Sequence, residues 1–261
     1  MLLAAPLVAQ DTSPRPLASA MEAMRGGDWS AAAELAARDG PAASDLVEWH
    51  RLRFGLGTPE DVLAFLDRNA DWPGLPYLRS RSEKSFAEAS DAQILAFFAG
   101  HRPQTAAGAL ALSRAQRRAG DTGAAEAGAV LAWRTLRMEA GEHAGFLADF
   151  GKILAPHHVA RLDESLWNGW QAEADRMLPL VPEDWQALAA ARLALRFDRP
   201  GVDALIEAVP DALQSDPGLA FERFAWRARR GRSEDAIEVL LDRSIGADGL
   251  GRPEAWADRR R

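Results

Sequence analysis

The chain has 261 residues, 48% of them hydrophobic and 26% charged, and a formal net charge of −7. These proportions are typical of globular proteins and argue against intrinsic disorder. The acidic balance provides no general attraction to nucleic acid or anionic lipid. There is no cysteine, which excludes disulfides, thiolate catalysis and Cys-ligated metal centres.

The N-terminal residues are apolar and then turn polar. Residues 1–9 resemble the apolar core and cleavage region of a secretory signal, although the preceding basic segment is missing. We therefore expect residues 1–16 to be a clipped signal segment and linker, residues 17–261 to fold, and the protein to be exported to the periplasm. The alternative is a frayed apolar N-terminus. No later run reaches the roughly 18 apolar residues that span a bilayer.

Helical spacing of apolar residues dominates from residue 17 onward, with breaks at Gly or Pro. Asp28, Thr58 (followed by Pro59) and Ser90 carry helix-capping chemistry. Alanine and leucine are abundant, and no segment alternates apolar and polar residues with period two. The sequence therefore predicts an all-α chain with no sheet.

One short pattern occurs three times. A glycine follows an arginine-bearing helix end, a polar turn comes next, and an alanine stands five residues after the glycine. The three pairs are Gly27 and Ala32, Gly120 and Ala125, and Gly231 and Ala236. A left-handed glycine ends the first helix, and the small alanine lets the second pack closely on it. Because one hairpin cannot bury its own apolar face, we predict a right-handed superhelical α-solenoid of stacked, tetratricopeptide-like hairpins.

The sequence predicts no catalytic, metal-binding or cofactor-binding residue. His157 and His158 are adjacent and point apart on a helix, and neither lies four residues from another histidine. Serine-nucleophile and phosphate-loop motifs are absent. We expect the carboxylates to lie exposed on helix surfaces rather than to form an acid–base pair. These carboxylates are Asp163, Glu164, Glu173, Glu183 and Asp184.

Nine tryptophans are spread along the chain, and most fall at apolar positions of predicted helices. We expect them in the core between helices, with each indole N–H bonded to a carbonyl. The alternative is a set of sugar-stacking platforms, for which Trp167 and Trp170 are the candidates because they lie close together near a turn. The arginine clusters are expected to be solvated helix faces. They comprise Arg227, Arg229, Arg230, Arg232 and Arg259 to Arg261.

Several segments resemble the superhelical N-terminal region of soluble lytic murein transglycosylases. The segments are residues 160–178 with 188–195, residues 69–74 with 81–83, and residues 252–259. The first pair contains Arg-Leu-Asp, Leu-Trp, Arg-Met-Leu and Ala-Arg-Leu-Ala-Leu in the family's order. The resemblance implies a solenoid that carries a lysozyme-like domain, which cleaves the glycan and leaves a 1,6-anhydro product.

The resemblance does not extend to the catalytic motif. In the family, the catalytic glutamate lies in a Glu-Ser pair followed by Gly-Leu-Met-Gln. Here Glu164-Ser165 lacks that continuation and belongs to the solenoid segment, so no catalytic residue carries over. The sequence stops within the family pattern after Arg259, which suggests a truncated product. A solenoid cut in this way would expose an apolar end face prone to self-association.

Two functions follow from these observations, and an active enzyme with an unrecognised site is a third, less favoured reading. The first is a non-catalytic scaffold in peptidoglycan turnover, whose partners are glycan strands or a lysozyme-like catalytic module. The second is an independent adaptor that binds a protein or peptide in a concave groove. Neither requires a cofactor, nucleic acid or a membrane span.

Overall fold

The computed structural model describes residues 15–246 and 248–257, and within these residues it contains helices and no strand. The prediction of an all-α chain without a sheet is confirmed for this part. The proposed signal at residues 1–9, most of the linker and Arg259 to Arg261 lie outside the described residues. The chain divides into two compact units, the first ending at Pro103 and the second beginning at Gln104.

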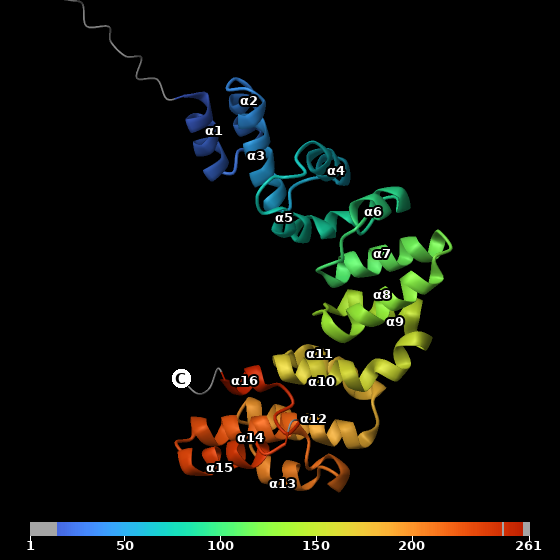
Figure 1. Cartoon of the computed structure of the whole chain (residues 1–261), viewed down its shortest axis with the longest axis vertical. Helices are drawn as coiled ribbons and strands as arrows, with labels where there is room; N and C mark the ends of the chain where they lie inside the picture. The colour runs from blue at the N-terminus through green and yellow to red at the C-terminus, as the bar shows by residue number, and fades with distance from the viewer. Residues whose placement is uncertain (1–14, 247, 258–261) are drawn as a thin grey trace, which may run out of the picture. The chain divides into compact units, whose positions relative to one another are not determined.

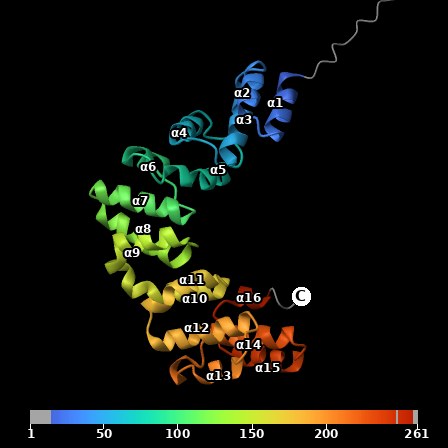
Figure 2. The same ribbon diagram turned by 180° about the vertical axis from the view of Figure 1, so that it is seen from behind.

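Unit one consists of short helices. They are α1 (Pro16–Arg25), α2 (Trp29–Ala37), α3 (Pro41–Arg53), α4 (Pro59–Arg68), α5 (Leu75–Ser82), the 3₁₀ helix η1 (Glu83–Phe86) and α6 (Asp91–Phe97). Helices α1, α2 and α3 lie side by side in both views (Figure 1; Figure 2). Their shared core is built largely from small side chains, including Ala20, Ala32 and Ala36.

Unit two contains helices of varied length. They are α7 (Ala106–Arg118), α8 (Thr122–Thr135), α9 (Ala140–Leu154), η2 (Ala155–His157), α10 (His158–Asn168), α11 (Gln171–Met177), η3 (Leu178–Leu180), α12 (Glu183–Arg196), α13 (Val202–Glu207), η4 (Asp211–Leu213), α14 (Pro217–Arg229), α15 (Ser233–Arg243) and α16 (Pro253–Ala257). One core runs from α7 to α12 and includes Trp133, Phe146 and Leu162. Further cores join α12 to α14 and α14 to α15.

The three predicted hairpin turns have the expected structure. Gly27, Gly120 and Gly231 adopt left-handed conformations, with φ of 80°, 88° and 73°. Each glycine N–H and the next N–H bond back to carbonyls of the preceding helix, which satisfies groups that a helix end leaves free. The paired helices are α1 with α2, α7 with α8 and α14 with α15. The alanine five residues after each glycine is buried in every case.

The predicted caps are also present. Asp28 accepts from the Ala31 N–H at 3.0 Å. Thr58 and Ser90 each form a capping box. The side chain of the capping residue accepts from the backbone N–H three residues later, and the side chain of that later residue accepts from the backbone N–H of the capping residue. The starts of these three helices are therefore encoded locally. No helix among the described residues combines the length and apolarity needed to cross a bilayer.

Candidate functional site

A buried ion pair forms the centre of the first polar cluster in unit two. Arg161 on α10 and Glu173 on α11 lie 2.6 Å apart, and both side chains are almost fully buried. Arg161 also donates to the carbonyls of Trp133 at 2.6 Å and Leu136 at 3.2 Å. Glu173 accepts from the Met138 N–H at 3.1 Å. The pair thus binds the α8–α9 connection to α10 and α11.

Glu173 is not the exposed surface carboxylate that the sequence predicted, and that prediction is wrong. Its partner Arg161 lies twelve positions earlier and on a different helix, so no local pattern signals the pair. Burial raises the pKa of Glu173, whereas the bond from Met138 and the charge of Arg161 oppose this change. A carboxylate already committed to an arginine and a backbone N–H is not poised to protonate a substrate.

A second polar cluster joins α10, α12 and α14. Arg192 on α12 is almost fully buried and lies 2.6 Å from Asp163 and 3.5 Å from Asp216. Arg196, one turn later, pairs with the buried Glu222. Burial raises the pKa of Asp216 and of Glu222, and the nearby arginines oppose this rise. These carboxylates also serve packing, because each holds two helices together through an arginine.

Four residues of the segments behind the predicted resemblance to lytic transglycosylases lie in or beside these clusters. Arg161 and Asp163 come from its Arg-Leu-Asp segment, and Arg192 from its Ala-Arg-Leu-Ala-Leu segment. Arg176, from the Arg-Met-Leu segment, donates to the Met138 carbonyl at 2.6 Å. Residues 160–178 and 188–195 thus contribute to two polar centres inside unit two, whereas residues 69–74 and 81–83 belong to unit one. The role of the four residues in this structure is to fix neighbouring helices.

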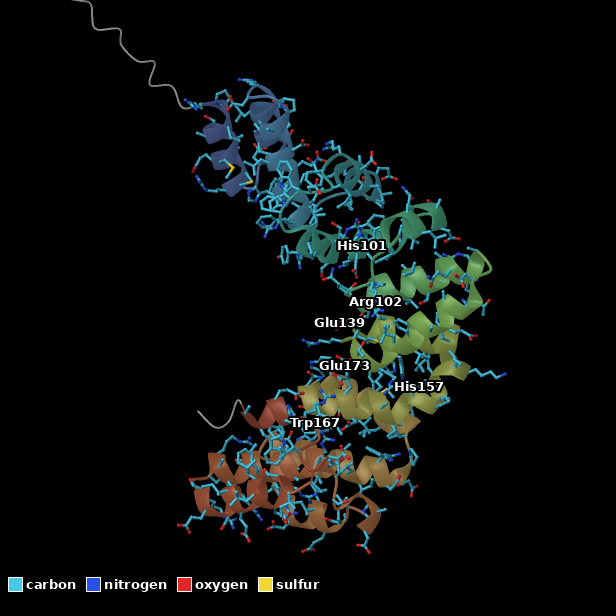
Figure 3. The ribbon with its side chains drawn as sticks, viewed as in Figure 1. His101, Arg102, Glu139, His157, Trp167 and Glu173 are labelled. Carbon is cyan, nitrogen blue, oxygen red and sulfur yellow. The ribbon has the colours of Figure 1, made fainter. Side chains whose placement is uncertain are left out.

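The structure places one of the two candidate glycan-contacting tryptophans, Trp167, beside the second cluster. Trp167 is half-buried, and its ring centroid lies 5.5 Å from that of Phe221 (Figure 3). The guanidinium carbons of Arg192 and Arg252 lie 5.2 Å and 5.3 Å from the same ring. Trp170 is half-buried at the start of α11. Contacts from within the chain therefore already occupy much of the Trp167 surface.

The other tryptophans follow the expected core pattern only in part, because Trp133 and Trp256 are buried whereas the remaining five are half-buried. The indole N–H groups of Trp49 and Trp256 donate to carbonyls, at 3.0 Å and 2.9 Å. Trp226 instead donates to the Asp198 carboxylate at 2.9 Å. Trp133 is fully buried, and its indole N–H has no hydrogen-bond partner in the described chain.

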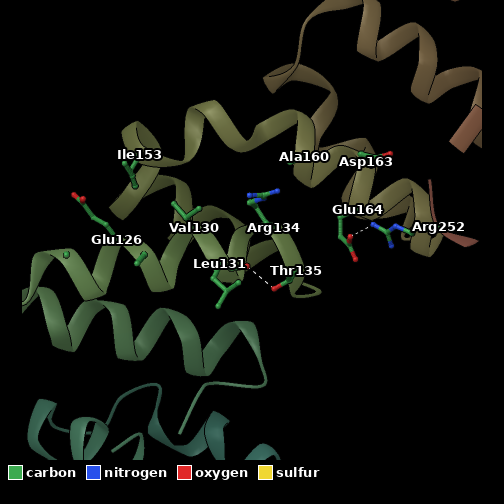
Figure 4. Close-up of a pocket in the computed structure, with 12 residues that line it drawn as sticks. Glu126, Val130, Leu131, Arg134, Thr135, Ile153, Ala160, Asp163, Glu164 and Arg252 are labelled. Carbon is green, nitrogen blue, oxygen red and sulfur yellow. Dashed lines mark hydrogen bonds and ion pairs between the residues drawn. The ribbon is translucent and has the colours of Figure 1, made fainter. Parts of the chain in front are cut away.

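An open groove of about 700 Å³ lies between α8, α9, α10 and the segment before α16 (Figure 4). Its apolar lining includes Val130, Leu131 and Ile153, and its charged lining includes Glu126 and Arg134. No aromatic side chain is among the residues that line this groove. Sugar-binding sites commonly stack a ring face on an aromatic side chain, so this lining suits a peptide better than a glycan.

Two carboxylates next to each other on α10 reach this groove. Glu164 pairs with Arg252 and accepts from the Asn168 amide at 2.6 Å. Asp163 is held by Arg192, as described above. Both side chains are thus engaged with neighbouring donors, and the groove presents no free pair of carboxylates of the kind that glycoside cleavage uses. No group of three or more His, Asp or Glu in the described residues is arranged to hold a metal ion.

Two histidines flank the buried Trp133 ring. His143 from α9 has its ring centroid 5.0 Å from that of Trp133, and His158 from α10 lies at 5.6 Å. The Nδ1 atoms of both histidines are buried without a hydrogen-bond partner in the described chain. Burial, followed by the nearby charges of Arg161 and Arg176 and by His158, lowers the pKa of His143 from 6.5 to about 4.

This shift predicts that acid destabilises unit two. Between pH 6.5 and about 4 the unfolded His143 binds a proton that the folded form excludes. The contribution of His143 to the free energy of unfolding is therefore fully present above pH 6.5. It falls as the pH decreases, by about 3 kcal/mol in total. Urea unfolding across this pH range measures the slope. His143→Gln should flatten it and His101→Gln should not; an unchanged slope in His143→Gln would contradict the prediction.

Comparison of the chain with protein-family models, with curated proteins and with solved structures finds no match.

Proposed function

We propose that this chain is a non-catalytic helical scaffold in peptidoglycan turnover. Its partners are glycan strands or a lysozyme-like catalytic module. The observation that carries this proposal is the position of the residues of the resemblance. Arg161, Asp163 and Arg192 sit in buried ion pairs that fix helices. Residues that hold helices together are expected in a structural scaffold rather than in an active site.

The same proposal includes a right-handed superhelix of tetratricopeptide-like hairpins and a periplasmic location. The three hairpins share one turn geometry, which is what stacked repeats of one ancestral unit would show. The location rests on the signal-like composition of residues 1–9.

A sacculus assay tests the function. The full chain is incubated with purified peptidoglycan sacculi and then sedimented, while turbidity and released fragments are followed. We expect the protein to sediment with the sacculi, with constant turbidity and no 1,6-anhydro fragments. Release of anhydro fragments would show catalysis and overturn the non-catalytic assignment. Failure to sediment would overturn the role in the cell wall.

The groove of Figure 4 favours a second candidate, an adaptor that binds an extended peptide. Its apolar and charged lining without aromatic rings is the observation behind it. Selection of peptides from a random library on the full chain should then yield binders that Leu131→Glu weakens. Leu56→Glu provides the matched control, because Leu56 and Leu131 are 51% and 50% exposed but only Leu131 lines the groove.

A further inference from the structure

Three apolar side chains on α15 and just after it have no cover within the described chain. Ile237, Leu241 and Ile245 follow each other at intervals of four residues and are 53%, 64% and 86% exposed. Ile237 and Leu241 therefore lie on one face of α15, and Ile245 follows two residues after the helix ends. All three line a hollow of about 970 Å³ that α14 and α15 form together. Contiguous apolar surface of this kind commonly marks an interaction site.

Two arginines of α14 and one at the end of α15 also line the hollow. Arg223 and Arg227 are one helical turn apart on α14, and Arg243 ends α15. Arg223 is half-buried and forms no ion pair with a carboxylate of the described chain. Arg227 donates to the backbone carbonyl of Asp235, which does not neutralise its charge. Burial and the charges of the other two arginines lower the pKa of Arg223, so these cations repel one another.

Acidic side chains complete the lining on α15. Glu234, Glu238 and Asp242 also recur every four residues and are exposed. The hollow therefore presents a basic row on α14 and, on α15, an acidic row together with the apolar row. A surface with this arrangement is specific for a partner whose own charges are arranged in rows.

We propose that the hollow between α14 and α15 binds an amphipathic helix of a protein partner that carries carboxylates one turn apart. Two carboxylates four residues apart on the partner helix match the spacing of Arg223 and Arg227 on α14. The rise along the helix axis over four residues is the same in both helices. The apolar stripe of the bound helix covers Ile237, Leu241 and Ile245. This site lies on different helices from the groove of Figure 4 and does not depend on the proposed role in peptidoglycan turnover.

The test uses two labelled synthetic helices of about 20 residues that share one leucine stripe. One carries glutamate pairs four residues apart beside the stripe, and the other carries lysine in their place. Fluorescence anisotropy with the full chain should show at least about tenfold tighter binding of the glutamate peptide. Added salt should weaken this preference. Absence of saturable binding, or equal affinity for the two peptides, would overturn the proposal.

Variants locate the site. Arg223→Glu combined with Arg227→Glu should reverse the preference between the two peptides. Arg25→Glu combined with Arg38→Glu makes the same charge change on exposed arginines of unit one and should leave the preference unchanged. Circular dichroism checks that both variants are folded. A second copy of the chain is the alternative occupant. The proposal is wrong if the chain self-associates, Leu241→Glu abolishes the self-association, and the glutamate peptide does not compete with it.

Discussion

Arg161→Met is expected to lower the free energy of unfolding of unit two by about 3–5 kcal/mol, because it removes the buried cation of Glu173 and leaves only the exposed Arg137, at 3.6 Å. Arg161 and Glu173 are 2.6 Å apart, and both side chains are at most 4% exposed, so water cannot replace the lost partner. The carbonyls of Trp133 and Leu136 lose a donor in the same variant. Urea unfolding followed by circular dichroism measures the change.

The double variant Arg161→Met with Glu173→Gln separates the cost of an unpaired charge from the loss of packing. Removing both charges should restore a substantial part of the stability that Arg161→Met loses. Arg25→Met removes an exposed arginine that pairs with Glu22, and its effect should stay below about 1 kcal/mol. A loss of similar size in Arg25→Met and Arg161→Met would mean that burial of the pair has no energetic importance.

Gly218→Ala is expected to destabilise the chain by about 3 kcal/mol, although alanine is the better helix former by about 1 kcal/mol. A Cβ atom at this position of α14 would lie 2.2 Å from the Arg192 guanidinium carbon. An arginine end can usually swing aside, but this one is almost fully buried and bonded to Asp163, with Asp216 close by. The guanidinium must therefore leave its carboxylates or α14 must shift.

Gly151→Ala is the matched control for this prediction. Gly151 lies inside α9, and a Cβ atom there meets nothing within 4 Å. Alanine should accordingly stabilise α9 by up to about 1 kcal/mol. The two glycine variants are thus expected to change the free energy of unfolding in opposite directions. Stabilisation by Gly218→Ala would show that Arg192 is free to move.

Local features of the fold were predictable from the sequence. The glycines of the three hairpin turns and the caps at Asp28, Thr58 and Ser90 act through bonds that span only a few residues. Such bonds depend on the nearest side chains, so a short pattern is sufficient to reveal them.

The polar clusters could not be predicted in the same way. Arg192 and Asp163 lie 29 positions apart, and Arg196 and Glu222 lie 26 apart. Partners at such separations meet only after the helices have packed, and an arginine or carboxylate on an amphipathic helix ordinarily indicates solvent. For Glu173 this expectation was wrong. The burial of His143 beside Trp133 likewise has no local signature, because it depends on the contact between α8 and α9.

The hairpin turns also determine where the chain tolerates a change in length. Three residues join the helices at each of Gly27, Gly120 and Gly231, and their backbone N–H groups bond to carbonyls of the preceding helix. An inserted residue would move the glycine away from the one position that needs its conformation. Residues 98–105, between α6 and α7, form a longer connection outside any helix. Reporter domains and epitope tags are therefore best inserted in that segment.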